Sequence, residues 1–286
     1  MNKTILLIFI CFAATVNAQQ IIPLYKDSIP GTKVNLKPEE QPTLEIYLPK
    51  NEKATGTSMI IFPGGAYQFL AYKEEGVAIA KAFAEKGIAA FVVKYRLPSD
   101  VTMKNKSIGP LQDAQQAIKM VRLRAKEWGL NPKAVGVIGF SAGGHVASTL
   151  GTHFKTNYIE NSEKTSLRPN FMILVYPVIS MDSKLTHSGS RESLLGSHPV
   201  ENQVWTFSNE QQVSFDTPPT YLTHTGDDAT VSVDNSIVFY KALQNNHVDA
   251  ELHLFPKGDH GFTQRLPINE WLDPILAFIK RERFLQ

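Results

Sequence analysis

The chain has almost no cysteine: Cys11 is the only one among 286 residues. Because Cys11 lies within an N-terminal apolar segment, the rest of the chain has no thiol for a disulfide, a thiolate metal site or a catalytic cysteine. An excess of charge of one sign is missing too, since 29 Lys and Arg balance 27 Asp and Glu, without a long run of either sign. Nothing in the sequence therefore favours nucleic acid or an anionic membrane as a partner.

Metal-binding motifs are also missing. The sequence has no His-Glu-x-x-His and no cysteine pair, and its carboxylates are scattered. We therefore expect neither a metal nor an organic cofactor. The composition, 43% hydrophobic and 20% charged residues, is that of an ordinary globular protein and excludes disordered, collagen-like and repeat classes.

Residues 1–18 have the features of a secretory signal peptide. Lys3 supplies the positive charge, residues 5–16 are apolar or small, and Val16-Asn17-Ala18 fits the small-x-small rule of signal peptidase. The apolar stretch is well short of the roughly 20 residues that span a bilayer, so we expect cleavage and no stable membrane insertion afterwards. The sequence thus predicts a secreted or periplasmic protein whose mature part, residues 19–286, forms one domain.

Short apolar runs alternate with stretches of helical periodicity along the mature chain. Strands separated by helices of this length pair in parallel through right-handed crossovers, which predicts an α/β fold with helices on both faces of a mostly parallel sheet. We expect strands at 43–48, 58–62, 89–95, 134–140, 171–176, 219–225 and 250–255, and helices at 74–86, 110–128, 142–153, 231–245 and 271–284.

One stretch, residues 181–217, breaks this alternation. Serine, asparagine and charged residues dominate it, with scattered apolar positions that include Trp205. A connection this long inside a compact domain is usually functional or mobile. We interpret it as a lid insertion beside the active site; the alternative is a solvated surface excursion.

The motif Gly139-Phe140-Ser141-Ala142-Gly143 stands where the strand at 134–140 gives way to the helix at 142–153. A serine on so sharp a turn projects its hydroxyl over the edge of the sheet, and small flanking residues let strand and helix approach. We predict that Ser141 is a nucleophile. The alternative is that the glycines serve close packing around a buried, non-catalytic serine.

A nucleophilic serine needs a base that is oriented by an acid, and in folds of this type the order along the chain is serine, acid, histidine. Of the eight histidines, His260 is flanked by glycines just past the last expected strand, so we predict it as the base. The acid should follow the preceding strand, where Asp227 and Asp228 are neighbours. Because adjacent side chains diverge, only one of them can reach His260.

The segment Pro63-Gly64-Gly65-Ala66 follows the strand at 58–62. Enzymes with a serine at a strand-to-helix turn place part of their oxyanion hole after such an early strand, and glycines let backbone amides face the reacting group. We predict that the amides of Gly65, Ala66 and Ala142 form this hole. The alternative is an ordinary strand-ending turn.

Together these motifs resemble the α/β-hydrolase superfamily, and more narrowly bacterial secreted esterases related to acetyl-xylan esterases, within reach of the hormone-sensitive-lipase group. By position, Ser141, Asp228 and His260 match the catalytic triad of those enzymes. The reading Pro63-Gly64-Gly65-Ala66 departs from the His-Gly-Gly-Gly of lipase-like relatives, which leaves the oxyanion donors open by one position. The resemblance covers most of the mature chain and includes Lys94-Tyr95-Arg96-Leu97, Asp113-Ala114-Gln115, Val121-Arg122, Val175-Tyr176-Pro177, Asn235-Ser236 and Gly258 to Phe262.

This resemblance implies a serine esterase that works through an acyl-enzyme and removes O-acetyl groups from plant-polysaccharide fragments such as xylan. The substrate would be a small ester or an acetylated oligosaccharide, with Tyr67 and Trp205 as candidates for contact with sugar rings. A broad short-chain carboxylesterase is the alternative among enzymes. A catalytically silent binding protein is the alternative of another class, which the presence of all three triad residues disfavours.

Overall fold

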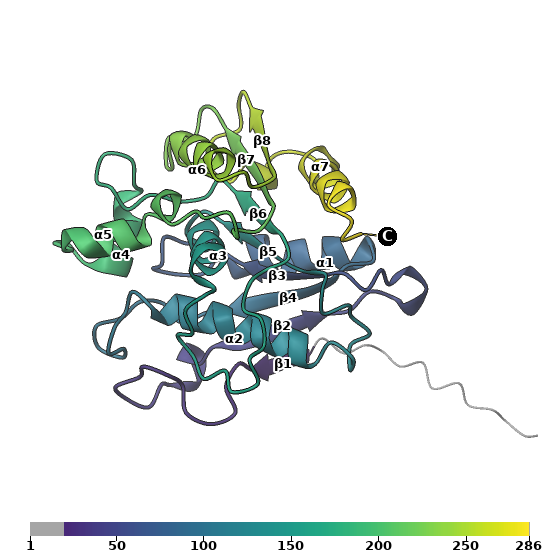
Figure 1. The fold of residues 1–286 in the computed structure, drawn as a ribbon, viewed down its shortest axis with the longest axis horizontal. Helices are drawn as coiled ribbons and strands as arrows, with labels where there is room; N and C mark the ends of the chain where they lie inside the picture. Colours follow the sequence, from purple (N-terminus) through teal and green to yellow (C-terminus); the bar gives the residue numbers. More distant parts are fainter. Residues whose placement is uncertain (1–19, 286) are drawn as a thin grey trace, which may run out of the picture.

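The computed structural model describes residues 20–285, so the predicted signal peptide at 1–18 lies outside the described residues. These residues form one eight-stranded sheet (Figure 1). Its strands are β1 (Gln20–Pro23), β2 (Thr43–Tyr47), β3 (Ser58–Phe62), β4 (Ala89–Lys94), β5 (Val135–Phe140), β6 (Met172–Val175), β7 (Thr220–Thr225) and β8 (Ala250–Phe255). The spatial order is β1-β2-β4-β3-β5-β6-β7-β8. The pairs β1–β2 and β2–β4 are antiparallel, and all pairs from β4 to β8 are parallel. The predicted α/β class is confirmed.

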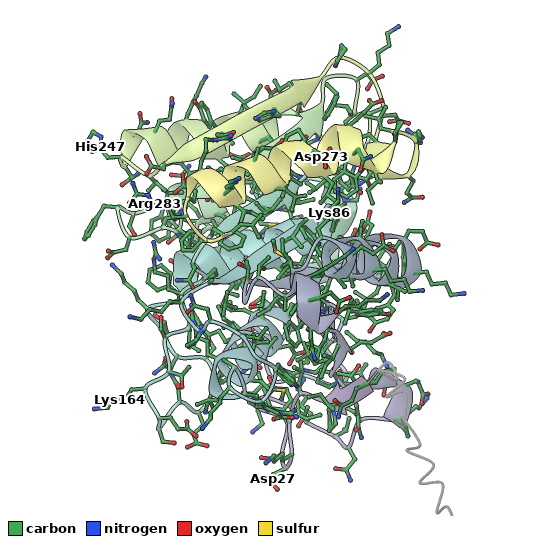
Figure 2. All side chains as sticks on the ribbon, turned by 90° about the vertical axis from the view of Figure 1, so that its right-hand side faces the viewer. Asp27, Lys86, Lys164, His247, Asp273 and Arg283 are labelled. Atoms are coloured by element: carbon green, nitrogen blue, oxygen red, sulfur yellow. The ribbon has the colours of Figure 1, made fainter. Side chains whose placement is uncertain are left out.

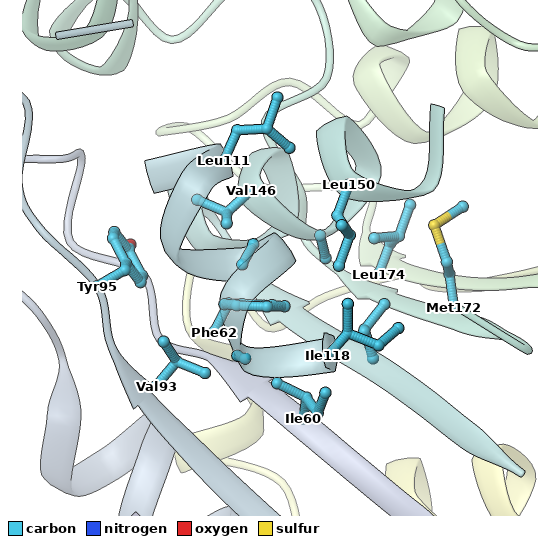
Figure 3. Packing of buried hydrophobic residues seen from close by; sticks show 14 of the residues in the cluster. Ile60, Phe62, Val93, Tyr95, Leu111, Ile118, Val146, Leu150, Met172 and Leu174 are labelled. Atoms are coloured by element: carbon cyan, nitrogen blue, oxygen red, sulfur yellow. The ribbon is translucent and has the colours of Figure 1, made fainter. Parts of the chain in front are cut away.

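Helices cover both faces of the sheet (Figure 1). On one face, α2 (Gly109–Leu123), α3 (Ala142–His153) and α6 (Asp234–Asn245) pack against the strands, and Figure 3 shows Ile118 and Val146 of this layer in one cluster with the strand residues Ile60 and Phe62. On the other face, α1 (Ala78–Glu85) and α7 (Ile268–Arg281) cover a second buried apolar cluster. A sheet that is buried on both faces requires continuous apolar strands, which is why the strands could be read from short apolar runs.

All seven predicted strands are present, with ends within one residue of those expected. The strand β1 was missed, because it is only four residues long and pairs only with β2 at the edge of the sheet. The helix expected at 74–86 is two elements: a π-helix, η3 (Tyr72–Val77), leads into α1. The helix expected at 110–128 ends at Leu123.

The segment 181–217 has more secondary structure than its sequence indicated. It contains α4 (Ser188–Leu195), α5 (Glu201–Phe207) and a 3-10 turn, η4 (Asn209–Gln211). The side chain of Asn209 is fully buried and donates hydrogen bonds to Ser148 Oγ at 2.7 Å and Thr149 Oγ1 at 3.0 Å on α3. This end of the segment is therefore anchored to the helix that follows Ser141, and the lid role remains a prediction.

The ionisable side chains labelled in Figure 2 lie at the periphery. Lys86 and Asp273, both labelled there, form an ion pair of 3.6 Å between the end of α1 and α7. None of the helices in residues 20–285 has the length and apolar character to cross a bilayer. Over the same range, no group of three or more His, Cys, Asp and Glu side chains is arranged to hold a metal ion.

Candidate active site

Ser141 occupies a strained turn between β5 and α3. Its φ of 51° and ψ of −119° lie where residues with a Cβ are rare, and such strain persists only when the surrounding structure enforces it. The Ser141 amide donates to the carbonyl oxygen of Val175 at 3.1 Å, and its own carbonyl accepts from the amide of Val178 at 3.0 Å. The connection after β6 therefore holds the turn from both sides.

Two glycines of the motif are required by close backbone contacts. A Cβ on Gly139 would lie 2.1 Å from the carbonyl oxygen of Gly143, and a Cβ on Gly143 would lie 2.0 Å from that of Phe62. Contacts this short cannot be relieved without moving backbone. The glycines thus let α3 start directly against β3 and β5, which brings its N-terminus under the serine.

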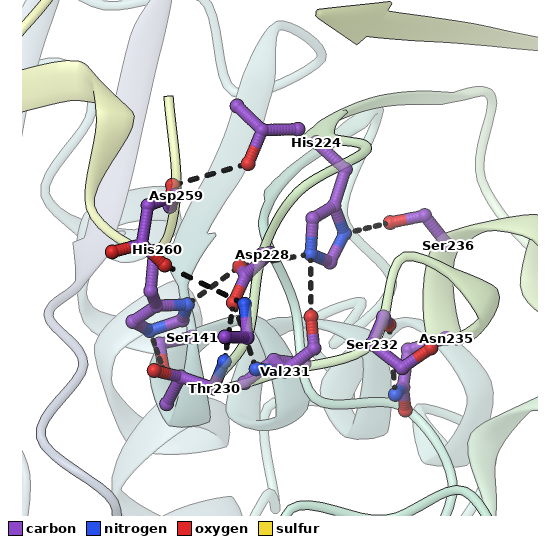
Figure 4. Close-up of polar contacts among 12 residues, drawn as sticks. Ser141, His224, Asp228, Thr230, Val231, Ser232, Asn235, Ser236, Asp259 and His260 are labelled. Atoms are coloured by element: carbon purple, nitrogen blue, oxygen red, sulfur yellow. Dashed lines mark hydrogen bonds and ion pairs between the residues drawn. The ribbon is translucent and has the colours of Figure 1, made fainter. Parts of the chain in front are cut away.

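The structure brings Ser141, His260 and Asp228 together at the carboxyl edge of the sheet (Figure 4). The Nε2 atom of His260 lies 3.0 Å from Ser141 Oγ, and its Nδ1 atom lies 2.7 Å from Asp228 Oδ2. The Asp228 side chain is fully buried, whereas that of His260 is 21% exposed. A hydroxyl bonded to an imidazole that is bonded to a carboxylate is the arrangement that activates a serine nucleophile.

Hydrogen bonds hold the Asp228 carboxylate in one orientation. Its Oδ1 atom accepts from the backbone amides of Thr230 at 2.9 Å and Val231 at 2.8 Å, and its Oδ2 atom accepts from His224 as well as His260. Burial raises the pKa of Asp228, but the bonds from His224, His260 and Val231 outweigh it and hold the pKa well below the usual range. Asp228 is therefore ionised at neutral pH.

Asp227 has a different position. Its Oδ1 atom accepts the backbone amide of Asp259 at 2.8 Å, and within the described chain the side chain forms no hydrogen bond or ion pair with His260. Asp259 itself has a positive φ of 54°. Asp227 therefore supports the loop before His260 from the outside, and the geometry separates the two neighbouring carboxylates in favour of Asp228.

His224 is a site residue that the sequence reasoning missed. Its Nε2 atom lies 3.1 Å from Asp228 Oδ2 and 3.0 Å from the carbonyl oxygen of Val231, and its Nδ1 atom lies 2.8 Å from Ser236 Oγ. Because a carbonyl oxygen only accepts, Nε2 must carry a proton and donate it. His224 thus fixes the acid from the side opposite His260; the sequence signal was its place at the end of β7, four residues before Asp228.

The loop after β3 lies against the serine. A Cβ on Gly64 would approach Ser141 Cβ to 2.9 Å, and the next three residues, Gly65, Ala66 and Tyr67, all have positive φ. This turn frees backbone donors: among residues 20–285, no protein group accepts a hydrogen bond from the amides of Gly65, Ala66 or Ala142. Ala142 is the first residue of α3, where amides lack intrahelical partners. The loop and the helix end can therefore supply oxyanion donors, and which of them do so remains a prediction.

The expected sugar contact by Tyr67 needs correction. Its side chain is only 2% exposed, and its hydroxyl lies 2.8 Å from Nδ1 of His145. The Nε2 atom of His145 donates to the carbonyl oxygen of Phe207, and burial lowers the pKa of His145 to about 4, so this neutral imidazole accepts from Tyr67. Tyr67 therefore supports from beneath the turn of residues 63–66, which is called the oxyanion loop after its predicted role. Trp205 on α5 is 54% exposed, and its predicted contact with sugar rings remains a prediction.

A model of the BD-FAE family matches residues 44–243, which is well over half of the chain. The chain belongs to the BD-FAE family. Among solved structures, this BD-FAE member is similar to the acetyl ester-xyloside bifunctional hydrolase from Caldicellulosiruptor lactoaceticus, with 37% identity, a TM-score of 0.82, and coverage of 93% of this chain and 97% of that one. The predicted membership of the α/β hydrolases is confirmed.

Two curated relatives are longer proteins. The acetylxylan esterase of Xylanibacter ruminicola is 36% identical over 234 residues, 80% of this chain and 45% of the relative. Endo-1,4-beta-xylanase B of Butyrivibrio fibrisolvens is 35% identical over 227 residues, 78% of this chain and 35% of the relative. The BD-FAE chain thus spans less than half the length of these two relatives.

Proposed function

We propose that this BD-FAE member is a secreted serine esterase that removes O-acetyl groups from plant-polysaccharide fragments such as xylan. The observation that carries the proposal is the hydrogen-bonded series from Ser141 through His260 to Asp228. The names of two relatives, an acetylxylan esterase and an acetyl ester-xyloside bifunctional hydrolase, support acetylated xylan fragments as the substrate class.

The first half of the reaction forms an acetyl-enzyme. Ser141 Oγ attacks the acyl carbon while His260 Nε2 takes its proton, and the carbonyl electron pair moves to the oxygen. Asp228 holds the hydrogen on Nδ1 of His260 and stabilises the imidazolium that forms. Collapse of the tetrahedral intermediate breaks the bond to the sugar oxygen, which leaves with the proton from His260.

The second half uses water. His260 takes a proton from a water molecule as that water attacks the acetyl group, and the next collapse returns this proton to Ser141 and releases acetic acid, which ionises to acetate in solution. In both halves the negative oxygen is stabilised by the amides of Gly65, Ala66 and Ala142, and one lost donor of this kind costs on the order of 10²-fold in rate.

Acetate release tests the proposal. The protein is incubated with acetylated xylan, pectin and chitin fragments and with aryl esters of rising acyl length, next to a Ser141→Ala variant. We expect the highest rate on acetylated xylan fragments, falling rates beyond short acyl groups, and no turnover by the variant. Preference for long acyl chains overturns the deacetylase assignment, and equal rates on all short esters indicate a broad carboxylesterase. A protein without turnover on any of these esters contradicts the esterase assignment and favours the catalytically silent alternative.

Export is part of the proposal and rests on the pattern of residues 1–18. N-terminal sequencing of the protein recovered from the periplasm or medium of an expressing bacterium tests it. We expect the recovered chain to begin at Gln19. A chain that stays in the cytoplasm with Met1 intact contradicts export and leaves the esterase assignment untouched.

A further inference from the structure

Glu75 is a buried carboxylate beside the candidate active site, with both oxygens hydrogen-bonded. Its side chain belongs to η3, and the residue is 5% exposed. Its Oε2 atom accepts the backbone amide of Gly64 at 2.7 Å, and its Oε1 atom accepts the hydroxyl of Tyr176 at 2.9 Å. We propose that Glu75 is a positioning residue that holds the oxyanion loop and the His260 loop in their catalytic arrangement. This inference rests on the proposed esterase function.

The first contact fixes the oxyanion loop. Gly64 lies between the carboxylate and the nucleophile, because a Cβ placed on it would come within 2.8 Å of Glu75 Oε2 and 2.9 Å of Ser141 Cβ. A hydrogen bond from an amide to a carboxylate is among the stronger ones in proteins and restricts rotation of the peptide that carries it. That peptide directly precedes the peptide that carries the Gly65 amide, so the bond limits where the predicted oxyanion donors can point.

The second contact reaches the base. Tyr176 has a φ of 37°, unusual for so large a side chain, and its ring centroid lies 4.8 Å from that of His260. Burial raises the pKa of Tyr176 well above its usual value, so its hydroxyl stays protonated. Since that hydroxyl donates to Glu75, it accepts from Thr263 Oγ1 at 2.9 Å, three residues beyond His260. One carboxylate thus joins the loops after β3, β6 and β8.

The local backbone and the burial of Glu75 both favour a role beyond stability. A π-helix is rare, and short π segments are frequently found at functional sites. Burial raises the pKa of Glu75, and the bonds from Gly64 and Tyr176 oppose this only in part. Within residues 20–285, no lysine or arginine forms an ion pair with Glu75. Burying a carboxyl group without a cation carries a desolvation penalty, and an apolar side chain of similar size would pack there without that penalty.

Glu75→Ala and Glu75→Gln separate positioning from bulk stability. Glutamine retains an oxygen for the Gly64 amide and has an NH₂ group that can donate to the Tyr176 oxygen, so it should preserve the arrangement. The assay is hydrolysis of 4-nitrophenyl acetate, with active sites counted by an organophosphonate. We expect Glu75→Ala to lower kcat/KM per titrated site by about 10²-fold, almost wholly in kcat, and Glu75→Gln to recover most of that loss.

Inhibition by a boronic acid distinguishes a positioning role from a purely structural one. The boronic acid forms a tetrahedral adduct with the serine, and one of its oxygens takes the place of the oxyanion. Its inhibition constant should rise in Glu75→Ala by the same factor by which kcat/KM falls, while KM stays close to the wild-type value. A residue needed only for folding would lower the number of titratable sites and leave the kcat of each site unchanged.

Glu45 offers a matched control. It is 2% exposed on β2 and accepts hydroxyl hydrogen bonds from Tyr47 at 2.5 Å and Tyr72 at 2.7 Å, so it is also a buried carboxylate between tyrosines. In the described chain it makes no hydrogen bond to the oxyanion loop. Glu45→Gln is expected to keep kcat/KM per site within about twofold.

The outcomes are distinguishable. A Glu75→Ala enzyme that keeps kcat/KM per site within about twofold of the wild type, or a Glu45→Gln enzyme that loses as much, overturns the inference. If Glu75→Ala does not fold, Glu75→Asp, which withdraws the carboxylate by one methylene, is judged by the same limits. When the wild type hydrolyses esters and Ser141→Ala does not, an unaffected Glu75 variant overturns only this inference. A wild type without esterase activity overturns the proposed function as well.

Discussion

The hydrogen bonds around Asp228 predict how its replacement with asparagine changes catalysis. The Oδ1 atom of Asp228 faces the backbone amides of Thr230 and Val231 at 2.9 Å and 2.8 Å. Both groups are donors, so only the carbonyl oxygen of the new side chain can take that place. Its NH₂ group must then stand where Oδ2 was, opposite Nδ1 of His260.

An NH₂ group in that place changes the tautomer of the His260 imidazole. It donates to Nδ1 of His260, so the ring hydrogen moves to Nε2, the atom that lies 3.0 Å from Ser141 Oγ and must accept its proton. The wrong tautomer removes the general base while the oxyanion donors and the substrate contacts remain. We expect kcat to fall by about 10⁴-fold, which is about 5.5 kcal/mol of transition-state stabilisation, with little change in KM.

The assay is steady-state hydrolysis of 4-nitrophenyl acetate at neutral pH, with circular dichroism to verify folding. Asp227→Asn is the matched control, because its carbonyl oxygen can still accept the Asp259 amide that Asp227 Oδ1 holds at 2.8 Å. It is expected to retain activity within about threefold. A folded Asp228→Asn enzyme within about tenfold of the wild type, or an equal loss in the control, refutes the assignment of the acid.

Three other changes test the fold, the turn and the inserted segment. Asp113→Ala leaves the Arg96 guanidinium, 2% exposed and 2.8 Å from the Asp113 carboxylate, buried without its partner, so urea denaturation should show a loss of about 3–5 kcal/mol; a loss below about 1 kcal/mol contradicts this. Gly143→Ala forces α3 away from β3, so esterase activity should disappear along with about 1–3 kcal/mol of stability, and an active variant would contradict the close contact. If 181–217 is a lid, Trp205→Ala should raise KM for acetylated oligosaccharides and leave 4-nitrophenyl acetate unaffected; unchanged kinetics on every substrate count against the lid.

The parallel strands were predictable from the sequence because burial on both faces makes each of them a short apolar run. The edge strand β1 was not, because its pairing with β2 depends on a neighbour that the four residues themselves do not specify. Helices α4 and α5 were missed for a similar reason. Their polar sequence has little periodicity, and α5 is held by a tertiary contact, the hydrogen bond from His145 on α3 to the carbonyl oxygen of Phe207.

The chain order of a serine, an acid and a histidine selected the three residues that the structure brings together, since each follows a strand at the same edge of the sheet. The residues that support the triad could not be predicted from local sequence patterns, because their partners lie far away in the sequence. Glu75 acts on Gly64, 11 positions away, and on Tyr176, 101 positions away. The mistake at Tyr67 has the same origin: an aromatic side chain can contact a sugar ring, but the burial of Tyr67 against His145 depends on a residue 78 positions away.

Covalent labelling tests the central claim most directly. The protein is treated with an organophosphonate and digested with trypsin, and the peptide of residues 134–155, which contains Ser141 and Ser148, is sequenced by mass spectrometry. The account predicts a single phosphonyl group on Ser141, with esterase activity falling in proportion to the fraction labelled. A label on another residue, or full activity in a protein completely labelled at Ser141, would contradict it.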